Sequence, residues 1–102
     1  MKECCKIYLN DQFGGDEAVT SEIYGEYVRS SGEKLAEIVD AIGRSDWSTV
    51  DKAAHAIKGI ALAVGDEPVA GLAIDLRTAS RLSDSDEANR LVQRLEKELA
   101  AL

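Results

Sequence analysis

The fold follows from Asp51-Lys-Ala-Ala-His-Ala-Ile-Lys-Gly-Ile-Ala-Leu-Ala-Val-Gly65, a stretch that also holds the only histidine of the 102-residue chain. At about 100° per residue, apolar residues at alternating spacings of three and four share one helical stripe: Trp47, Val50, Ala54, Ile57, Ala61 and Val64. The spacing predicts an amphipathic helix that buries this stripe in a core. His55 falls about 130° from the centre of the stripe. We therefore expect its imidazole to stand in solvent.

Four neighbours on the same predicted face could serve a site at His55. Lys58, at i+3, lies within side-chain reach and could neutralise a dianionic group on the ring, while Asp51 lies one turn before the histidine. Gly59 sits in mid-helix, where glycine costs roughly 1 kcal/mol relative to alanine, and this suits close approach by another backbone. Leu62 would be an exposed apolar residue suited to docking. Lys58, Gly59 and Leu62 also have ordinary readings: a solvated lysine, a tolerated glycine and a single surface leucine.

Three motifs carry a resemblance to a known family. The first is Ala54-His55-Ala56-Ile57-Lys58-Gly59, followed by a small Ala61 and by Gly65 ten residues after the histidine. The others are Phe13-Gly14-Gly15-Asp16 and Asp46-Trp47, which precede the first long helix and the histidine helix. Together they resemble the histidine-containing phosphotransfer (HPt) domains of multistep two-component signalling. The chain departs from the family at Leu76-Arg77, where a Leu-Glu pair is usual, and at Pro68, where proline is rare.

The resemblance implies a phosphorelay carrier. It implies that His55 accepts a phosphoryl group from a receiver-domain aspartate and passes it to another response regulator. Lys58 would stabilise the phosphoryl charge, and Asp51, Gly59 and Leu62 would dock the receiver. The implied partners are response-regulator receiver domains and a hybrid sensor histidine kinase. Mg²⁺ would belong to the receiver, so we expect no cofactor and no metal site in this chain.

Two other functional classes compete with this interpretation. A helical adaptor could bind receiver domains without accepting phosphate, although an exposed His55 argues against that role. A small hydrolase or metal protein would need a second histidine or a cysteine cluster, and the sequence has neither. The sequence also lacks a Gly-x-x-x-x-Gly-Lys-Ser/Thr loop, so we expect a stoichiometric carrier without autonomous ATP-dependent kinase activity, and not an enzyme.

Composition restricts the class of protein and its partners. With 45% hydrophobic and 30% charged residues, the chain is typical of one globular domain, which we expect to span residues 1–102. A net charge of −7 disfavours nucleic acid and anionic lipid, so the partner should be a protein. No apolar run is long enough for membrane insertion. Cys4 and Cys5 form no disulfide framework and read as small hydrophobes, so we expect a cytoplasmic protein. We also expect a monomer.

Helical patterning continues on the N-terminal side of the histidine stretch. Residues 2 to 12 can form a short helix with Ile7, Tyr8 and Leu9 as apolar contacts. Asp16 can cap a long helix that stops at Gly43. Its expected buried stripe is Val19, Ile23, Tyr27, Leu35, Ile38 and Ile42. A capping box formed by Ser30 and Glu33 leaves open a kink, or two shorter helices, in this region.

The C-terminal half predicts the remaining helices. Ser45 is expected to cap the histidine helix, which runs to about Gly65, and Asp66 to cap the next helix, which ends near Leu82. Asp84 and Glu87 form a plausible capping pair for the last helix. The two buried stripes are expected at Val69, Leu72, Leu76 and Ala79, and at Ala88, Leu91, Val92, Leu95, Leu99 and Leu102. Long helices and short loops predict an all-α fold: an antiparallel four-helix bundle over about residues 16–102 with a short extra N-terminal helix.

Overall fold

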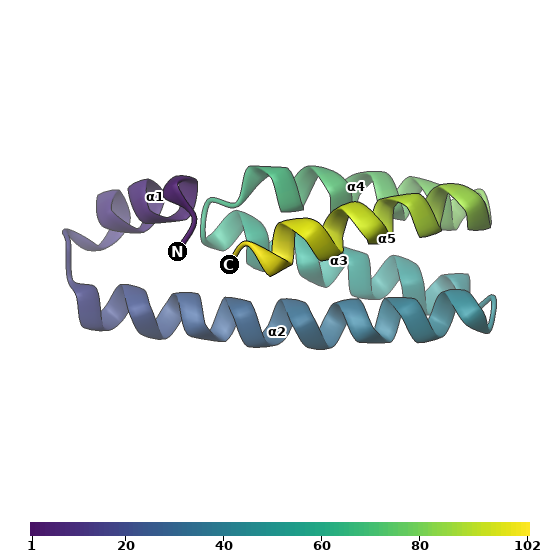
Figure 1. The fold of residues 1–102 in the computed structure, drawn as a ribbon, viewed down its shortest axis with the longest axis horizontal. Helices are drawn as coiled ribbons and strands as arrows, with labels where there is room; N and C mark the ends of the chain where they lie inside the picture. Colours follow the sequence, from purple (N-terminus) through teal and green to yellow (C-terminus); the bar gives the residue numbers. More distant parts are fainter.

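Five helices and no strand make up the chain in a computed structural model that describes all residues 1–102 (Figure 1). They are α1 (Glu3–Phe13), α2 (Glu17–Gly43), α3 (Trp47–Ala63), α4 (Glu67–Arg81) and α5 (Ser85–Ala100). The four long helices run antiparallel along the 43 Å axis of the molecule. The all-α bundle with an extra N-terminal helix is therefore confirmed. None of the helices combines the length and apolar character that a membrane span requires.

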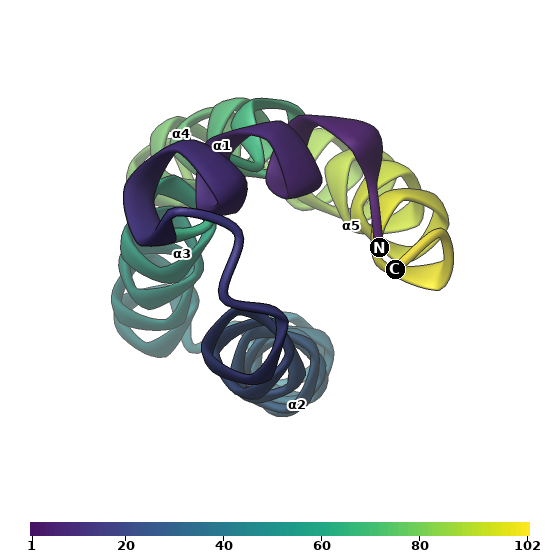
Figure 2. The same cartoon turned by 90° about the vertical axis from the view of Figure 1, so that its left-hand side faces the viewer.

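The long helices pack in the order of the chain. α3 lies between α2 and α4, α4 also packs against α5, and α5 returns to contact α2. An end-on view shows α1 running across the ends of α3, α4 and α5 (Figure 2), and Figure 1 shows it beside the first turns of α2, beyond the ends of the other three long helices. α3 is therefore flanked by two helices and leaves its outer side uncovered.

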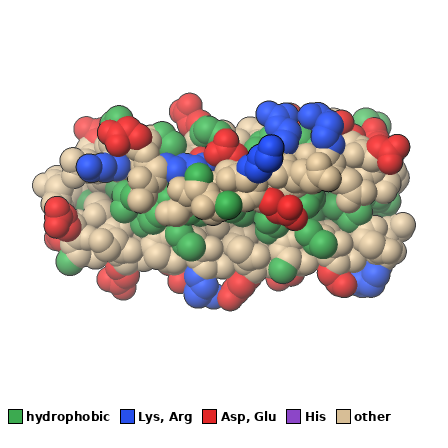
Figure 3. Space-filling view, viewed as in Figure 1, with side chains coloured by type: hydrophobic (Ala, Val, Ile, Leu, Met, Phe, Trp, Pro, Cys, Tyr) green, Lys and Arg blue, Asp and Glu red, His purple; other side chains and the backbone are tan.

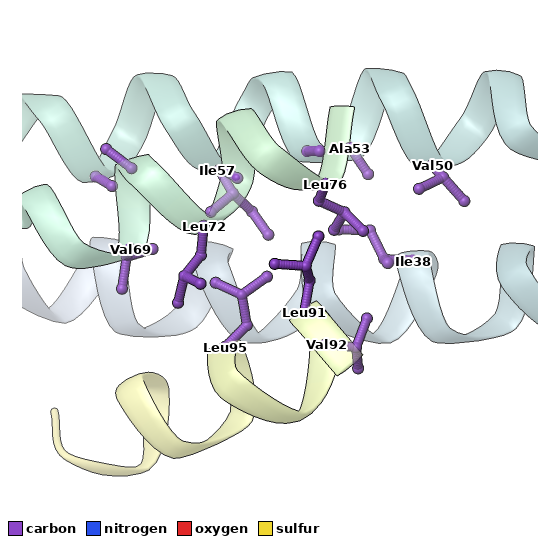
Figure 4. Close-up of a cluster of buried hydrophobic side chains, with 14 of the residues drawn as sticks. Ile38, Val50, Ala53, Ile57, Val69, Leu72, Leu76, Leu91, Val92 and Leu95 are labelled. Carbon is purple, nitrogen blue, oxygen red and sulfur yellow. The ribbon is translucent and has the colours of Figure 1, made fainter. Parts of the chain in front are cut away.

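The core is formed by the predicted stripes. Ile57 of α3 lies fully buried with Leu76 of α4 and Leu95 of α5, and Ile38 of α2 faces them. Figure 4 shows these side chains pointing toward one another from four helices. The predicted stripe of α3 is buried throughout except for Trp47, which is partly buried against the core. Burial of this stripe fixes the rotation of α3 about its own axis, and with it the direction of His55.

Three helix connections repeat one six-residue pattern, Ala-x-x-x-(Ser/Gly)-Asp. The amides of Asp46, Asp66 and Asp84 donate to the carbonyls of Ala41, Ala61 and Ala79 at 2.8, 2.9 and 2.9 Å. The residue before each aspartate has a positive φ: 55° at Ser45, 73° at Gly65 and 50° at Ser83. Each helix thus ends in a Schellman-type turn, and the aspartate caps the next helix at once.

This turn corrects one sequence prediction. The carboxylate of Asp46, not the hydroxyl of Ser45, caps α3, because Asp46 Oδ1 accepts from the Thr49 amide at 3.2 Å. Ser45 instead holds the left-handed position that ends the preceding helix. The predicted caps at Asp16, Asp66 and Asp84 are confirmed.

α2 is a single unbroken helix, which settles the question of a break near Ser30. The hydroxyl of Ser31 is buried and donates to the Tyr27 carbonyl at 2.7 Å, so the serine is satisfied within the helix. Val19 is exposed, against prediction, because Thr20 and Tyr24 face inward in this first part of α2.

Of the three apolar contacts predicted for α1, Leu9 is buried as expected, whereas Ile7 and Tyr8 are not. The buried residues of α1 are Cys5 and Leu9, whereas Ile7 is 63% exposed and Cys4 is also exposed. Because α1 crosses the bundle end, only residues four apart point inward. Tyr8 lies half-exposed on Gly65, where any Cβ would collide with the tyrosine. Gly65 is therefore required for two reasons: its φ is positive, and Tyr8 of α1 packs directly against it.

A buried ion pair fastens α1 to the bundle. Lys2 Nζ lies 3.0 Å from Oδ2 of the fully buried Asp66 and 2.6 Å from Oε2 of Glu98. The Tyr27 hydroxyl donates to Asp66 Oδ2 at 2.7 Å. Asp66 thus caps α4 and joins α1, α2 and α4.

Burial shapes the titration of this cluster. It raises the pKa of the Tyr27 hydroxyl, which also donates to Asp66, and raises the pKa of the Cys5 thiol to about 12. For Lys2, burial opposes the charge, but the hydrogen bonds to Glu98 and Asp66 outweigh it and raise the pKa. Proton loss from any of the three groups is therefore harder in the folded protein.

Candidate functional site

His55 stands on the uncovered side of α3, as the helical spacing predicts. His55 is exposed, while Ala54 and Ile57 on the opposite side of the helix are fully buried. No histidine is visible on the side of the molecule drawn in Figure 3, where α2 and α5 present scattered charges of both signs. The imidazole is therefore accessible from a side of the bundle that α2 and α5 do not cover.

Arg77 reaches the histidine from α4. Its Nη1 lies 3.0 Å from Nδ1 of His55, and its Nε donates to Oδ1 of Asp51 at 3.0 Å. One guanidinium thus joins two α3 side chains that are one turn apart. Asp51, predicted as a docking residue, is half-buried and occupied by this ion pair.

Sequence reasoning missed Arg77 as a partner of His55. The signal that could have found it is the Leu76-Arg77 pair, because this is where the chain departs from the Leu-Glu usual in the family it resembles. Leu76 is fully buried and fixes the rotation of α4. Arg77, the next residue, consequently lies at the α3–α4 boundary.

The other predicted residues lie beyond His55 along α3. Lys58 is half-buried and forms no salt bridge with any carboxylate of the chain. A Cβ placed on Gly59 would meet no atom within 4 Å, so nothing inside the molecule requires glycine there. Leu62 is 47% exposed. These three residues leave a free cation, an open backbone surface and an apolar side chain on the same side as the histidine.

Ile74 adds an apolar residue that the sequence did not single out. It is 48% exposed and lies one turn before Arg77 on α4. Because Arg77 of α4 contacts Asp51 and His55 of α3, we group the exposed aliphatic side chains of Leu62 and Ile74 with them as one two-helix surface. Its polar groups are Asp51, His55, Lys58 and Arg77.

A comparison with protein families gives this surface a context. The model of the Hpt domain family matches residues 22–102, which include α3, α4 and α5 in full. The chain therefore belongs to the Hpt domain family. Its members take part in histidine phosphotransfer within two-component phosphorelays, as carriers and not as autonomous kinases. The match begins inside α2, so α1 lies outside it. Searches of curated proteins and of solved structures found no match.

Proposed function

We propose that His55 accepts a phosphoryl group from the aspartyl phosphate of a response-regulator receiver domain and passes it to a second regulator. The observation that carries this proposal is the exposure of the chain's single histidine on α3, inside the matched family region. A hybrid sensor histidine kinase would supply the first receiver. The proposal treats residues 1–102 as one carrier domain that acts as a cytoplasmic monomer.

The transfer needs little from this chain beyond a placed nucleophile. A nitrogen lone pair of the neutral imidazole forms the N–P bond while the P–O bond to the receiver aspartate breaks, and the bonding electrons leave on the carboxylate oxygen. Phosphoryl transfer depends mostly on alignment and on charge stabilisation. The Mg²⁺ that supplies part of this stabilisation belongs, in the proposal, to the receiver.

Lys58 is the proposed phosphate-stabilising residue. It follows His55 at i+3 and has no carboxylate partner inside the molecule, so its ammonium is free to face an added phosphoryl group. A single charge of this kind contributes on the order of 1–3 kcal/mol to the transition state. Lys58 would therefore assist the transfer without being indispensable.

The docking surface follows from the same two helices. The open space above Gly59 permits close approach of a receiver backbone, and the exposed side chains of Leu62 and Ile74 offer apolar contact. Asp51 lies at the edge of this surface, held by Arg77. The proposed docking set is therefore Asp51, Gly59 and Leu62, with Ile74 added from the structure.

A labelled receiver tests the function directly. Incubated with a phosphorylated receiver and Mg²⁺, the wild-type protein should gain one phosphate that is labile in acid and stable in alkali, as a phosphoramidate is. His55→Gln should gain none. Lys58→Ala should slow transfer by about one to two orders of magnitude without preventing it. Receiver binding without any phosphate on the wild type would favour the adaptor interpretation instead.

Paired variants test the docking surface. Gly59→Glu places bulk and negative charge one turn from His55, and should abolish transfer from an acidic receiver pocket while the helical circular dichroism remains. Gly32→Glu is the matched control, because Gly32 is also an exposed helical glycine with open space above it, but on α2. Leu62→Asp should weaken receiver binding through lost apolar contact and added repulsion. Equal transfer by both glutamate variants would remove Gly59 from the interface.

A further inference from the structure

The contact between Arg77 and His55 determines where the ring proton lies. A guanidinium has only N–H donors and stays charged in proteins. Nδ1 of His55, 3.0 Å from Arg77 Nη1, must therefore accept that hydrogen bond with its lone pair. A neutral imidazole carries its single proton on the other nitrogen. In this arrangement the proton of His55 is on Nε2.

In this arrangement the imidazole is not nucleophilic. The lone pair at Nδ1 is held by Arg77, and Nε2 carries the proton, so neither nitrogen has a free in-plane lone pair. The guanidinium is fixed by two contacts, because Arg77 Nε also donates to Asp51 Oδ1 at 3.0 Å. Asp51 lies one helical turn before His55 and keeps the guanidinium beside the ring.

We propose that Arg77 sets the tautomer of His55 and thereby holds the unphosphorylated carrier in a resting form, from which Nε2 can attack only after the guanidinium leaves Nδ1. This inference rests on the proposed function for its consequence in transfer, but the tautomer itself does not depend on it. Arg77 is a positioning residue in this scheme, because it acts through the imidazole.

The docked receiver supplies the means of release. Its phosphoryl group is an anion that attracts a guanidinium and can bind it through two hydrogen bonds. Once Arg77 turns away, Nδ1 takes one proton from water and Nε2 gives one to water, which leaves the ring neutral. The Nε2 lone pair then attacks phosphorus, the aspartyl P–O bond breaks, and the positive ring loses its Nδ1 proton to solvent.

Nitrogen NMR of the ¹⁵N-labelled full chain tests the tautomer, at a pH where the ring is neutral. The wild type should show Nε2 as the protonated nitrogen and Nδ1 as the unprotonated one. Arg77→Glu offers only acceptors, so the two assignments should exchange. Arg81→Glu is the matched control: the same charge change one turn along α4, where no bond to His55 exists, should leave the wild-type pattern. If Arg77→Glu fails to fold, Arg77→Met should show a mixture of both tautomers.

The same spectra separate failure of this inference from failure of the proposed function. A wild-type ring protonated on Nδ1, or an Arg77→Glu ring still protonated on Nε2, would overturn the tautomer assignment even if transfer is normal. After phosphorylation, the N–P coupling should place phosphorus on Nε2; phosphorus on Nδ1 would overturn the proposed route of attack. An exchange of assignments together with no phosphate on any variant would support the tautomer and reject the carrier function.

Discussion

Two aspartates of this protein are bonded in similar ways and lie in opposite environments. Asp66 pairs with Lys2 of the N-terminal segment and accepts from the Tyr27 hydroxyl, with its own side chain fully buried. Asp51 pairs with Arg77 of α4 at the half-exposed surface, and the same guanidinium extends to His55. Each aspartate joins its helix to a cation from a distant part of the sequence.

The difference lies in what each cluster leaves unsatisfied. All buried side-chain nitrogen and oxygen atoms have a hydrogen-bond partner, so the Asp66 cluster has nothing left to offer a ligand. The Asp51 cluster ends in an exposed imidazole with one nitrogen bonded inside the molecule. A closed network holds helices together, whereas an open one of similar composition can become reactive once its internal contact at the imidazole is released. The predictions below test this contrast, beginning with the largest effect.

The largest expected effect is the loss of Asp66. Asp66→Ala leaves Lys2 without its buried partner and removes the α4 cap, and breaking a buried pair typically costs 3–5 kcal/mol of unfolding free energy. Asp51→Ala removes a half-exposed pair and should cost about 1 kcal/mol or less. Urea denaturation of the two variants measures both values. Equal losses of unfolding free energy would mean that the two clusters contribute equally to stability.

The second prediction compares neighbours on α3. Ile57→Ala removes a fully buried side chain and should lower the free energy of unfolding by about 2–5 kcal/mol. His55→Ala, two residues earlier and exposed, should change it by less than about 0.5 kcal/mol. Thermal unfolding followed by circular dichroism separates the two. An unfolded His55→Ala variant would make the histidine a structural residue.

The third prediction concerns alkaline pH. The pKa values of Cys5, Tyr27 and Lys2 are raised from 9.0, 10.0 and 10.5, so their stabilising contributions are complete below those values and are lost as pH rises through the folded ones. Unfolding free energy should be level near neutrality and fall above about pH 9, by up to about 1.4 kcal/mol per pH unit for each proton involved.

Two variants locate the origin of this alkaline loss. Tyr27→Phe removes one titrating group and should make the fall shallower, at a cost near neutrality of about 1–3 kcal/mol because Asp66 loses a donor. Arg77→Gln should leave the slope unchanged. A slope that responds to Arg77 but not to Tyr27 would place the alkaline sensitivity in the open cluster.

The smallest expected effect lies in the helix connections. Ser45 and Ser83 hold positive φ values that glycine adopts without strain, so Ser45→Gly and Ser83→Gly should each stabilise the fold, by about 1 kcal/mol at most. Ser21→Gly, inside α2 and exposed, should instead destabilise it by about 0.5–1 kcal/mol. Differential scanning calorimetry resolves the opposite signs. Destabilisation by all three would show that the serine hydroxyls matter more than the backbone angle.

The sequence predicts the bundle well because buried stripes repeat over several turns. The α3 stripe alone determines that His55 is exposed. The sequence is a poorer guide to the buried residues of α1. An 11-residue helix that crosses the end of a bundle has too few inward positions for their spacing to form a recognisable pattern. The sequence predicts Ser45 instead of Asp46 as the cap of α3, because both are good capping residues and only the backbone angle distinguishes them.

The contact between Arg77 and His55 lay beyond sequence reasoning for a different reason. It depends on how far α4 slides along α3, and a helical period defines rotation but not translation. The departure from Leu-Glu at Leu76-Arg77 marked the position without indicating its partner. The sequence pattern therefore predicts which side of α3 carries the site. The packing of α3 against α4 determines which side chain contacts His55 there.

The six-residue turns also determine the direction in which His55 points around the axis of α3. In each turn the left-handed residue that ends one helix is followed directly by the aspartate that caps the next, so no spare residue separates them. One residue inserted between Ala41 and Asp46 would have to break the turn's hydrogen bond or turn α3 by about 100°. The turn thus fixes the rotation of α3 about its own axis. The direction in which the His55 imidazole points is therefore set at the start of its helix.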